Sequence, residues 1–86
     1  MDKADKDKVD QLVSLIDLVI GDTSIPKNIR KAMSDAKEKL LTEEDLTVSA
    51  SSAIYILNEV SEDINMPMHA RTQLWTILSA LETVKS

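Results

Sequence analysis

The sequence lacks most of the residue types on which small catalytic and metal-binding sites depend. Its 86 residues include no cysteine, one histidine and one glycine. Without cysteine the chain has no disulfide, no thiolate nucleophile and no cysteine-ligated zinc or iron–sulfur site. His69 alone cannot make a multi-histidine metal site, and Gly21 alone cannot make a glycine-rich phosphate loop. These absences predict a protein that needs no cofactor and no metal and is not an enzyme.

Large aromatic rings and long apolar runs are also scarce. There is no phenylalanine, so Trp75 and Tyr55 are the only large rings, and the core must be built from Leu, Ile, Val, Ala and Met. No apolar run approaches the roughly 18 residues that a transmembrane helix needs. Residues 1–10 mix Asp and Lys and carry no apolar signal region. We therefore expect a soluble cytoplasmic protein with no membrane association.

The residues that are present favour one helical domain. Hydrophobic residues make up 43% of the chain and charged residues 29%, while glycine and proline are nearly absent. This balance favours helices over strands. The length fits a single domain, residues 1–86. The net charge of −5 disfavours nucleic acid as a general partner, because a phosphate backbone repels an acidic protein.

Apolar residues recur at helical spacing in four segments of the chain. In the first segment, Val9, Leu12 and Ile16 belong to one wide apolar stripe. Gly21 follows this segment and is a residue type that commonly ends a helix. Short connections make consecutive helices antiparallel neighbours. The pattern predicts an all-α fold, a four-helix up-and-down bundle, with helices at about 5–21, 26–41, 45–63 and 67–84.

The residues between these segments indicate where the helices start. Pro26 and Pro67 suit the first positions of the second and fourth helices, because proline lacks the N–H that would be unpaired there. Either Thr42 or Asp45 can cap the third helix with a side-chain oxygen.

A shift of 41 residues aligns the second half of the sequence with the first. We interpret the halves as two similar helical hairpins. In each half an Asp follows the first helix, and we expect it to face the positive end of the helix that comes next. An Arg one turn into that helix is expected to reach back to this Asp or to the last carbonyls of the preceding helix. The matched residues are Asp22, Pro26 and Arg30 in the first half and Asp63, Pro67 and Arg71 in the second.

The same features resemble a HEAT-type repeat, which also has an Asp in the turn and an Arg in the second helix. The spacing between them is longer here by about two residues, and a solenoid normally needs three or more repeats to bury its core. We therefore predict a closed bundle. The alternatives are a HEAT-like repeat and a two-hairpin unit completed by dimerisation.

Three stretches carry a resemblance to a known family: residues 24–30 (SIPKNIR), 52–59 (SAIYILNE) and 65–75 (NMPMHARTQLW). They resemble archaeal uncharacterised protein family one-four-seven, and the likeness covers nearly everything after Val9. The resemblance implies a small all-helical bundle. It implies no activity and no catalytic residues, because that family has no assigned biochemical role.

Two polar groupings are candidates for chemistry. His69, at the start of the fourth predicted helix, would need a nearby carboxylate and a nucleophile to act as a base, so a surface or capping role is favoured. Glu59, Glu62 and Asp63 are expected to share one side of the third helix, which allows a lone hard-cation contact. The Glu-x-x-His pairs of a di-metal bundle are missing. We interpret the three carboxylates as a solvated acidic face.

Charges of opposite sign are concentrated in different parts of the chain. Residues 27–39 hold five basic and two acidic side chains, whereas residues 43–63 hold six acidic and none basic. Complementary pairing within the bundle is the favoured interpretation, at up to about 1 kcal/mol for each exposed pair. The alternative is RNA- or ribosome-associated binding through the Lys27–Lys39 face, although that face has no interleaved aromatic residue.

Several large residues fall outside the predicted core stripes of the first, third and fourth helices. Arg71 precedes Trp75 by one helical turn, a spacing that allows the guanidinium to stack on the ring. Trp, Met, Tyr and Arg are the residue types enriched in binding patches. The sequence therefore predicts a non-catalytic protein-interaction or self-associating module that binds another protein or a second copy. Its candidate interaction surface is Leu15, Leu18, Tyr55, Met68, Arg71 and Trp75.

Overall fold

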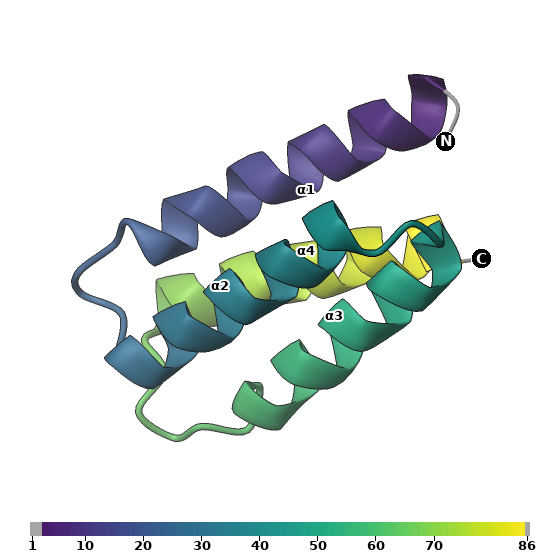
Figure 1. Cartoon of the computed structure of the whole chain (residues 1–86). Helices are drawn as coiled ribbons and strands as arrows, with labels where there is room; N and C mark the ends of the chain where they lie inside the picture. Colours follow the sequence, from purple (N-terminus) through teal and green to yellow (C-terminus); the bar gives the residue numbers. More distant parts are fainter. Residues whose placement is uncertain (1–2, 86) are drawn as a thin grey trace.

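Four helices account for nearly all of the chain. The structure, a computed structural model, describes residues 3–85. None of its helices is long and apolar enough to cross a membrane within this range. The all-α prediction is confirmed by the four helices (Figure 1), which are α1 (Lys3–Ile20), α2 (Lys27–Thr42), α3 (Leu46–Val60) and α4 (Met68–Lys85).

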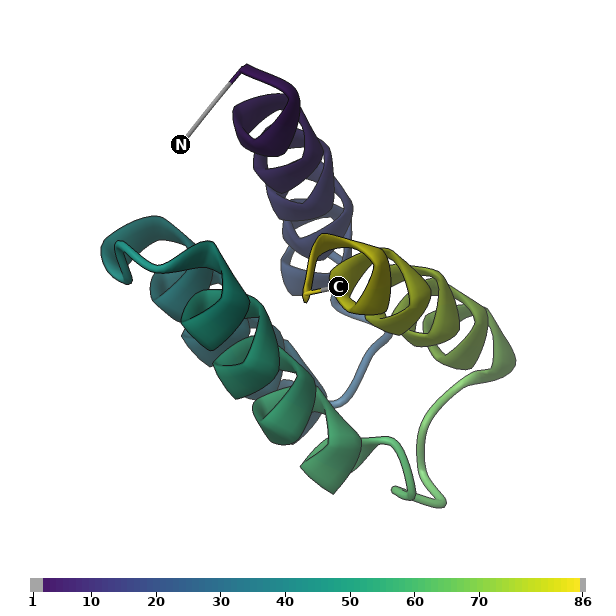
Figure 2. The ribbon, with the colours of Figure 1, turned by 90° about the vertical axis from the view of Figure 1, so that its right-hand side faces the viewer.

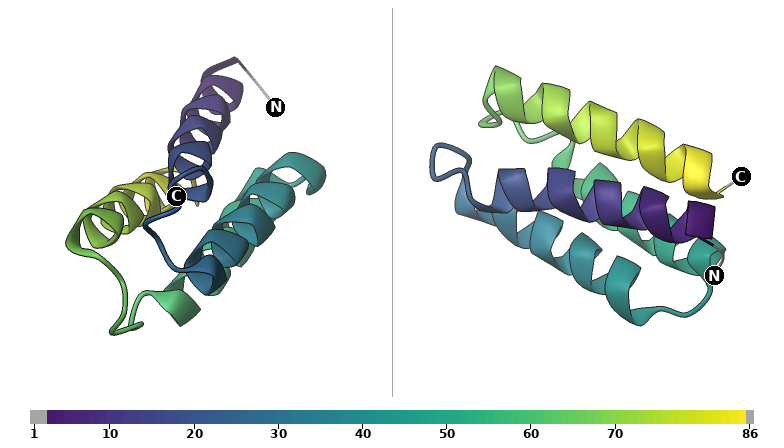
Figure 3. Two further views of the ribbon diagram at one scale, coloured as in Figure 1. Left: turned by 90° about the vertical axis from the view of Figure 1, so that its left-hand side faces the viewer. Right: turned by 90° about the horizontal axis from the view of Figure 1, so that it is seen from above.

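The four helices form a closed ring. Helix α1 packs on α2, α2 on α3, α3 on α4, and α4 returns to α1. Figure 2 shows α1 and α4 on one side of the molecule and α2 and α3 on the other. The α1–α2 and α3–α4 turns lie at one end, and the α2–α3 turn lies at the other (Figures 1 and 3). Because the first and last helices pack together, the fold is an up-and-down bundle and not an open HEAT-like stack.

Each helix turns one apolar stripe towards a shared core. The stripes follow the helical spacing of the sequence, and complete burial of one Leu or Ile side chain contributes about 1.5–3 kcal/mol. Residues from both hairpin turns join them. The buried core consists of Val9, Leu12, Ile16, Val19, Ile25, Ile29, Met33, Ala36, Leu40, Ala50, Ala53, Ile54, Leu57, Met66, Ala70, Leu74, Ile77 and Leu81.

Helix α3 is shorter than the sequence pattern predicts. It starts after Asp45, the second of the two candidate caps, whose Oδ1 accepts a hydrogen bond from the Val48 N–H at 3.2 Å. It ends at Val60 and not at residue 63, because the Ser61 N–H bonds to the Asn58 carbonyl at 3.3 Å and tightens the last turn. The bounds of the other three helices differ from the predicted ones by one or two residues.

Gly21 follows the last residue of α1. It does not adopt the left-handed conformation that is common for a glycine at the end of a helix. Its N–H donates to the Asp17 carbonyl at 3.0 Å, and no residue in the described range has a positive φ. A Cβ atom at position 21 would meet the Asp17 carbonyl oxygen at 3.4 Å, which is close to ordinary contact. The backbone of this turn therefore does not depend on glycine.

Small core residues distinguish α3 from its counterpart α1. Ala50 and Ala53 are fully buried in α3, whereas the equivalent positions of α1 hold Val9 and Leu12. In α1 the residues at these positions are larger, and α1 leaves a groove where it packs on α4. The groove has a volume of about 210 Å³ and is lined by Lys8, Gln11, Leu12, Leu15, Ala80, Thr83 and Val84.

Replacing Ala53 by Leu is expected to lower the free energy of unfolding by about 1–3 kcal/mol, because the added atoms must displace packed neighbours. Urea denaturation followed by circular dichroism measures the change. Thr47→Leu adds volume at an exposed position of the same helix and should stay within about 0.5 kcal/mol of the wild type. Equal effects of the two substitutions would contradict the close packing of α3.

Candidate functional site

The turn between α1 and α2 is organised by the carboxylate of Asp22. Its Oδ1 accepts hydrogen bonds from the Ser24 backbone N–H at 2.9 Å and from the Ser24 hydroxyl at 2.6 Å. The Asp22 N–H donates to the Val19 carbonyl, and the Ile25 N–H donates to the Asp22 carbonyl, both at 3.1 Å. These bonds reverse the chain and deliver Ile25 to the core, where it is buried.

The turn between α3 and α4 repeats this arrangement. Asp63 Oδ1 accepts from the Asn65 N–H at 2.8 Å. The Asp63 N–H donates to the Val60 carbonyl at 3.1 Å, and the Met66 N–H donates to the Asp63 carbonyl at 3.2 Å. Met66 is buried, as Ile25 is in the first hairpin. Each of these bonds joins residues equivalent to those of the first turn, which supports the interpretation of two similar hairpins.

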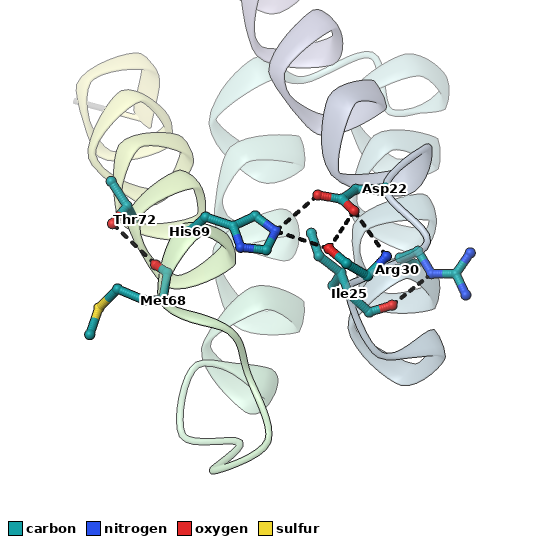
Figure 4. Close-up of polar contacts among 7 residues, drawn as sticks. Asp22, Ile25, Arg30, Met68, His69 and Thr72 are labelled. Atoms are coloured by element: carbon teal, nitrogen blue, oxygen red, sulfur yellow. Dashed lines mark hydrogen bonds and ion pairs between the residues drawn. The ribbon is translucent and has the colours of Figure 1, made fainter.

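Each of the two carboxylates also reaches across to the other hairpin. His69 Nε2, in the first turn of α4, lies 2.9 Å from Asp22 Oδ2 (Figure 4). Asn28 Nδ2, in the first turn of α2, donates to Asp63 Oδ2 at 2.7 Å. Asn28 and His69 occupy equivalent positions in the repeat. We call these two symmetry-related contacts the cross-hairpin clasp.

The predicted partner of each of the two aspartates is wrong. The sequence predicts that each Asp faces the start of the helix that follows it. In the structure Asp22 faces the first turn of α4, and Asp63 faces the first turn of α2. Both carboxylates still lie near a positive helix end, but that helix belongs to the opposite hairpin, because the bundle places the two turns side by side.

The two arginines of the repeat have different partners. Arg71 Nη1 donates to the Ser61 carbonyl at 3.1 Å, and its Nη2 donates to the Asp63 carbonyl at 3.2 Å, so this guanidinium closes the end of the preceding helix as expected. Both of its terminal nitrogens are held on backbone carbonyls. Arg30 Nε donates to the Ile25 carbonyl at 3.0 Å, and the rest of its guanidinium points away from the turn (Figure 4).

Ser24, His69 and Asp22 lie together, yet their geometry is not that of a nucleophilic relay. In such a relay the serine and the carboxylate bind opposite nitrogens of the histidine ring, and the hydroxyl donates to the ring. Here His69 Nε2 faces both Ser24 Oγ at 3.2 Å and Asp22 Oδ2 at 2.9 Å, while the hydroxyl donates to Asp22. Because a carboxylate only accepts, Nε2 carries a proton and cannot take one from Ser24. The cluster connects the two hairpins, and its hydrogen bonds lack the order of such a relay.

Hydrogen bonds lower the pKa of both clasp carboxyls. The pKa of Asp22 falls below its ordinary value mainly because the Ser24 hydroxyl and N–H donate to the ionised form, and His69 adds to this effect. The pKa of Asp63 is lowered first by the Asn28 amide and then by the Asn65 N–H. The folded protein therefore favours the charged form of both groups.

The acidic residues do not form a metal centre in the part of the chain that the structure describes. No group of three or more possible His, Asp or Glu ligands gathers there. Glu59 and Glu62 are exposed, whereas Asp63 is bonded to Asn28 and Asn65. The predicted acidic side of the third helix is divided because α3 ends before Glu62.

The predicted interaction residues are distributed over three helices. Leu18 on α1 is 63% exposed and Tyr55 on α3 is 69% exposed, whereas Leu15 is half-buried against the core and lines the α1–α4 groove. Met68 and Trp75 are 78% and 63% exposed. Two turns of α4 separate them, so they lie on the same side of that helix.

Aligning the hairpins shows that the exposed apolar residues at the start of α4 have polar counterparts in the first hairpin. We define the apolar face as Ile64, Met68 and Trp75; Ile64, in the turn before α4, is 92% exposed. The equivalent residues of the first hairpin are all polar, so the fold does not need apolar side chains there. These counterparts are Thr23, Lys27 and Ser34.

The first hairpin presents a hollow of different chemistry at the corresponding place. It has a volume of about 540 Å³ and lies where α1 ends and α2 begins. We call it the cationic hollow. Its lining residues are Ile20, Lys27, Asn28, Arg30, Lys31 and Ser34.

The stability of the protein is expected to fall as the pH drops below about 4. Asp22 and Asp63 have lower pKa values in the folded than in the unfolded chain. Their stabilisation is therefore complete above the unfolded pKa and is lost as the pH falls through the folded pKa. Calorimetry should show a flatter dependence of Tm on pH for the Asp22→Asn/Asp63→Asn variant. Glu44→Gln/Glu62→Gln, the charge-matched exposed control, should keep the wild-type slope; identical slopes for the two variants would refute this account.

His69→Ala is expected to lower Tm by a few degrees at most, because the contact with Asp22 that it removes is partly exposed to solvent. His69→Gln should recover much of the Tm lost in His69→Ala, since its amide nitrogen reaches about as far as the imidazole Nε2. A double-mutant cycle of thermal melts tests the pairing. His69→Ala and Asp22→Ala should be non-additive, whereas His69→Ala and Asp63→Ala should add. Additivity in both pairs would rule out the clasp.

The chain is similar to proteins of one family throughout its length. The family described as Uncharacterised protein family (UPF0147) matches residues 1–84. A UPF0147 protein of Methanocaldococcus jannaschii is 51% identical over 72 residues, which cover 83% of this chain and 77% of that protein. A UPF0147 protein of Thermococcus kodakarensis is 51% identical over 79 residues, which cover 90% and 95%.

Two solved structures share the fold. A crystal structure described as that of the unknown function protein MMP1188 is 44% identical, with a TM-score of 0.90 over 100% of this chain and 97% of the other. A protein of family UPF0147 from Thermoplasma acidophilum is 34% identical, with a TM-score of 0.88 over 96% and 99%. These matches confirm the resemblance found in the sequence, and the chain belongs to the uncharacterised protein family UPF0147.

Proposed function

We propose that this protein is a non-catalytic cytoplasmic module that binds another protein or a second copy of itself. The observation that carries the proposal is the exposure of Met68 and Trp75 at positions where the first hairpin has Lys27 and Ser34. The same fold thus tolerates polar residues at both places. The apolar residues therefore need an explanation other than folding.

Binding supplies such an explanation. Trp is among the residues that contribute most to protein interfaces, and Met fills irregular apolar gaps. A line of apolar residues along one helix is also a common way to dock into a groove of a partner. Isolated exposed apolar residues are ordinary, but Met68 and Trp75 lie on the same side of one helix, after the fully exposed Ile64.

The polar cluster around His69 supports a non-catalytic role. Nε2 of His69 is bonded within the molecule, to Asp22 and Ser24, and the arrangement lacks the order needed for proton abstraction. The cluster fixes the position of α4 at its start. It therefore supports the helix that presents the apolar face.

Exchange of the apolar face for its polar counterparts tests the proposal. The variant Met68→Lys/Trp75→Ser copies the first hairpin, so it is expected to change stability by no more than about 0.5 kcal/mol. Sedimentation velocity over a concentration series should show self-association of the wild type and a monomer for the variant. If the partner is another protein, cross-linking in cells that naturally make the protein should give a discrete product that the variant loses.

Leu41→Ser is the control, because Leu41 is similarly exposed but lies on α2, outside the predicted interaction surface. It should leave both measurements unchanged. A wild type that is monomeric throughout, with the same cross-linked products as the double variant, would overturn the proposal.

A further inference from the structure

The cationic hollow concentrates the positive charge of an otherwise acidic protein. Lys27, Arg30 and Lys31 line it within little more than one turn of α2, whereas the whole chain has a net charge of −5. Elsewhere on α2, Lys37 is neutralised by Asp17 of α1 at 2.7 Å. Part of the positive charge that the sequence places on residues 27–39 therefore gathers, in the structure, at the start of α2.

The cations of the hollow have few partners within the protein. Lys31 pairs with Asp35 at 3.3 Å, but both side chains are exposed, so this pair contributes little. Arg30 uses Nε for the Ile25 carbonyl, and its terminal nitrogens point outward (Figure 4). Its counterpart Arg71 places both terminal nitrogens on backbone carbonyls. Hairpin closure therefore does not account for the free end of Arg30.

Folding does not require these charges either. Cations are unfavourable in the first turn of a helix, and α2 has no acidic residue there to offset them. The second hairpin forms the same turn with Met68 and Thr72 in place of Lys27 and Lys31. Three like charges at this place therefore weaken the helix slightly, and an anionic partner would remove that cost.

We propose that the cationic hollow binds the phosphodiester backbone of a nucleic acid, a role separate from that of the apolar face. The terminal nitrogens of Arg30 offer paired N–H donors that match two oxygens of one phosphate. Lys27 and Lys31 carry point charges on flexible stems, and their backbone positions are separated by a rise of about 6 Å along the helix, so they can contact neighbouring phosphates. Ser34 and Asn28 add polar groups to the lining, although the Asn28 amide is already bonded to Asp63.

The chemistry of the hollow favours a polyanion over other anionic partners. Lys27 and Lys31 are exposed and Arg30 is half-buried, so a single small phosphate gains little, whereas a polyanion also gains from the release of several counterions. Much of the lining is apolar, from Ile20 and the aliphatic stems of the lysines and the arginine, so competition by polyglutamate is the measurement that distinguishes an acidic protein segment from a nucleic acid. With no aromatic residue in the hollow, base stacking is not part of the contact. RNA and DNA of the same form are therefore expected to bind alike.

The sequence disfavoured nucleic acid as a general partner because of the net negative charge. The structure supports a more local contact, since Lys27, Arg30 and Lys31 line one hollow at the start of α2. Three phosphate contacts predict that log K falls with log salt with a slope of about −2 for a single strand and about −3 for a duplex. Such binding is weak at physiological salt and becomes measurable as the salt is lowered.

Fluorescence anisotropy with labelled 20-nucleotide RNA and DNA strands, from low to physiological salt, tests the proposal on the full chain. Lys27→Gln/Lys31→Gln should weaken binding at low salt by about tenfold or more and reduce the magnitude of the salt slope by about half or more. Lys6→Gln/Lys8→Gln, with the same charge change on exposed α1 residues, should have a much smaller effect. Trp75→Ser should bind as the wild type does, which separates this test from that of the apolar face.

Three results would overturn the proposal. The first is no binding at low salt, or equal losses for the two double-lysine variants. The second is competition by inorganic phosphate or by polyglutamate as effective as that by unlabelled strand at the same ionic strength, which would indicate a small-anion or an acidic-protein site. The third is a clear preference for RNA over DNA, which would require recognition beyond the backbone. Thermal melts of every variant establish that a loss of binding is not a loss of folding.

Discussion

The whole fold depends on a hydrophobic core that neither hairpin can complete alone. Each helix has one apolar stripe, and two helices packed together leave part of each stripe uncovered. In the bundle the equivalent residues Ile16 and Leu57, one from each hairpin, are both fully buried in the same core. A chain of this length buries only a small apolar area, so the two hairpins must contribute to one common core. The closed ring is the arrangement in which all four stripes are covered.

Helical periodicity made the helices and most of the core predictable. Residues three and four apart lie on one side of a helix, and the stripe that begins with Val9 and Leu12 is buried as its spacing indicates. The end of α3 was harder to predict because Ser61 and Asp63 have helical neighbours in the sequence. Their carbonyls accept bonds from Arg71, as the repeat predicts, but the repeat does not give the residue at which the helix stops.

The cross-hairpin clasp required information that local sequence does not carry. Local interpretation relates Asp22 to the nearest helix start, and His69 is 47 residues away. The bundle brings the opposite helix start within hydrogen-bond distance. The repeat held part of the answer, since Asn28 and His69 are equivalent and a contact by one Asp implies the matching contact by the other. In the same alignment the two clasp aspartates are identical. The residues of the apolar face, in contrast, correspond to different residue types in the first hairpin.

The order of the helices has a consequence for how this protein can be joined to other objects. Both ends of the described chain leave the bundle beside the α2–α3 turn, far from the clasp (Figures 1 and 3). The apolar face and the cationic hollow start at the clasp end, one after each hairpin turn. A fused domain, an affinity tag or a surface linker at either terminus is therefore attached at the opposite end of the molecule. A protein attached through either terminus therefore leaves both the apolar face and the cationic hollow accessible to solvent.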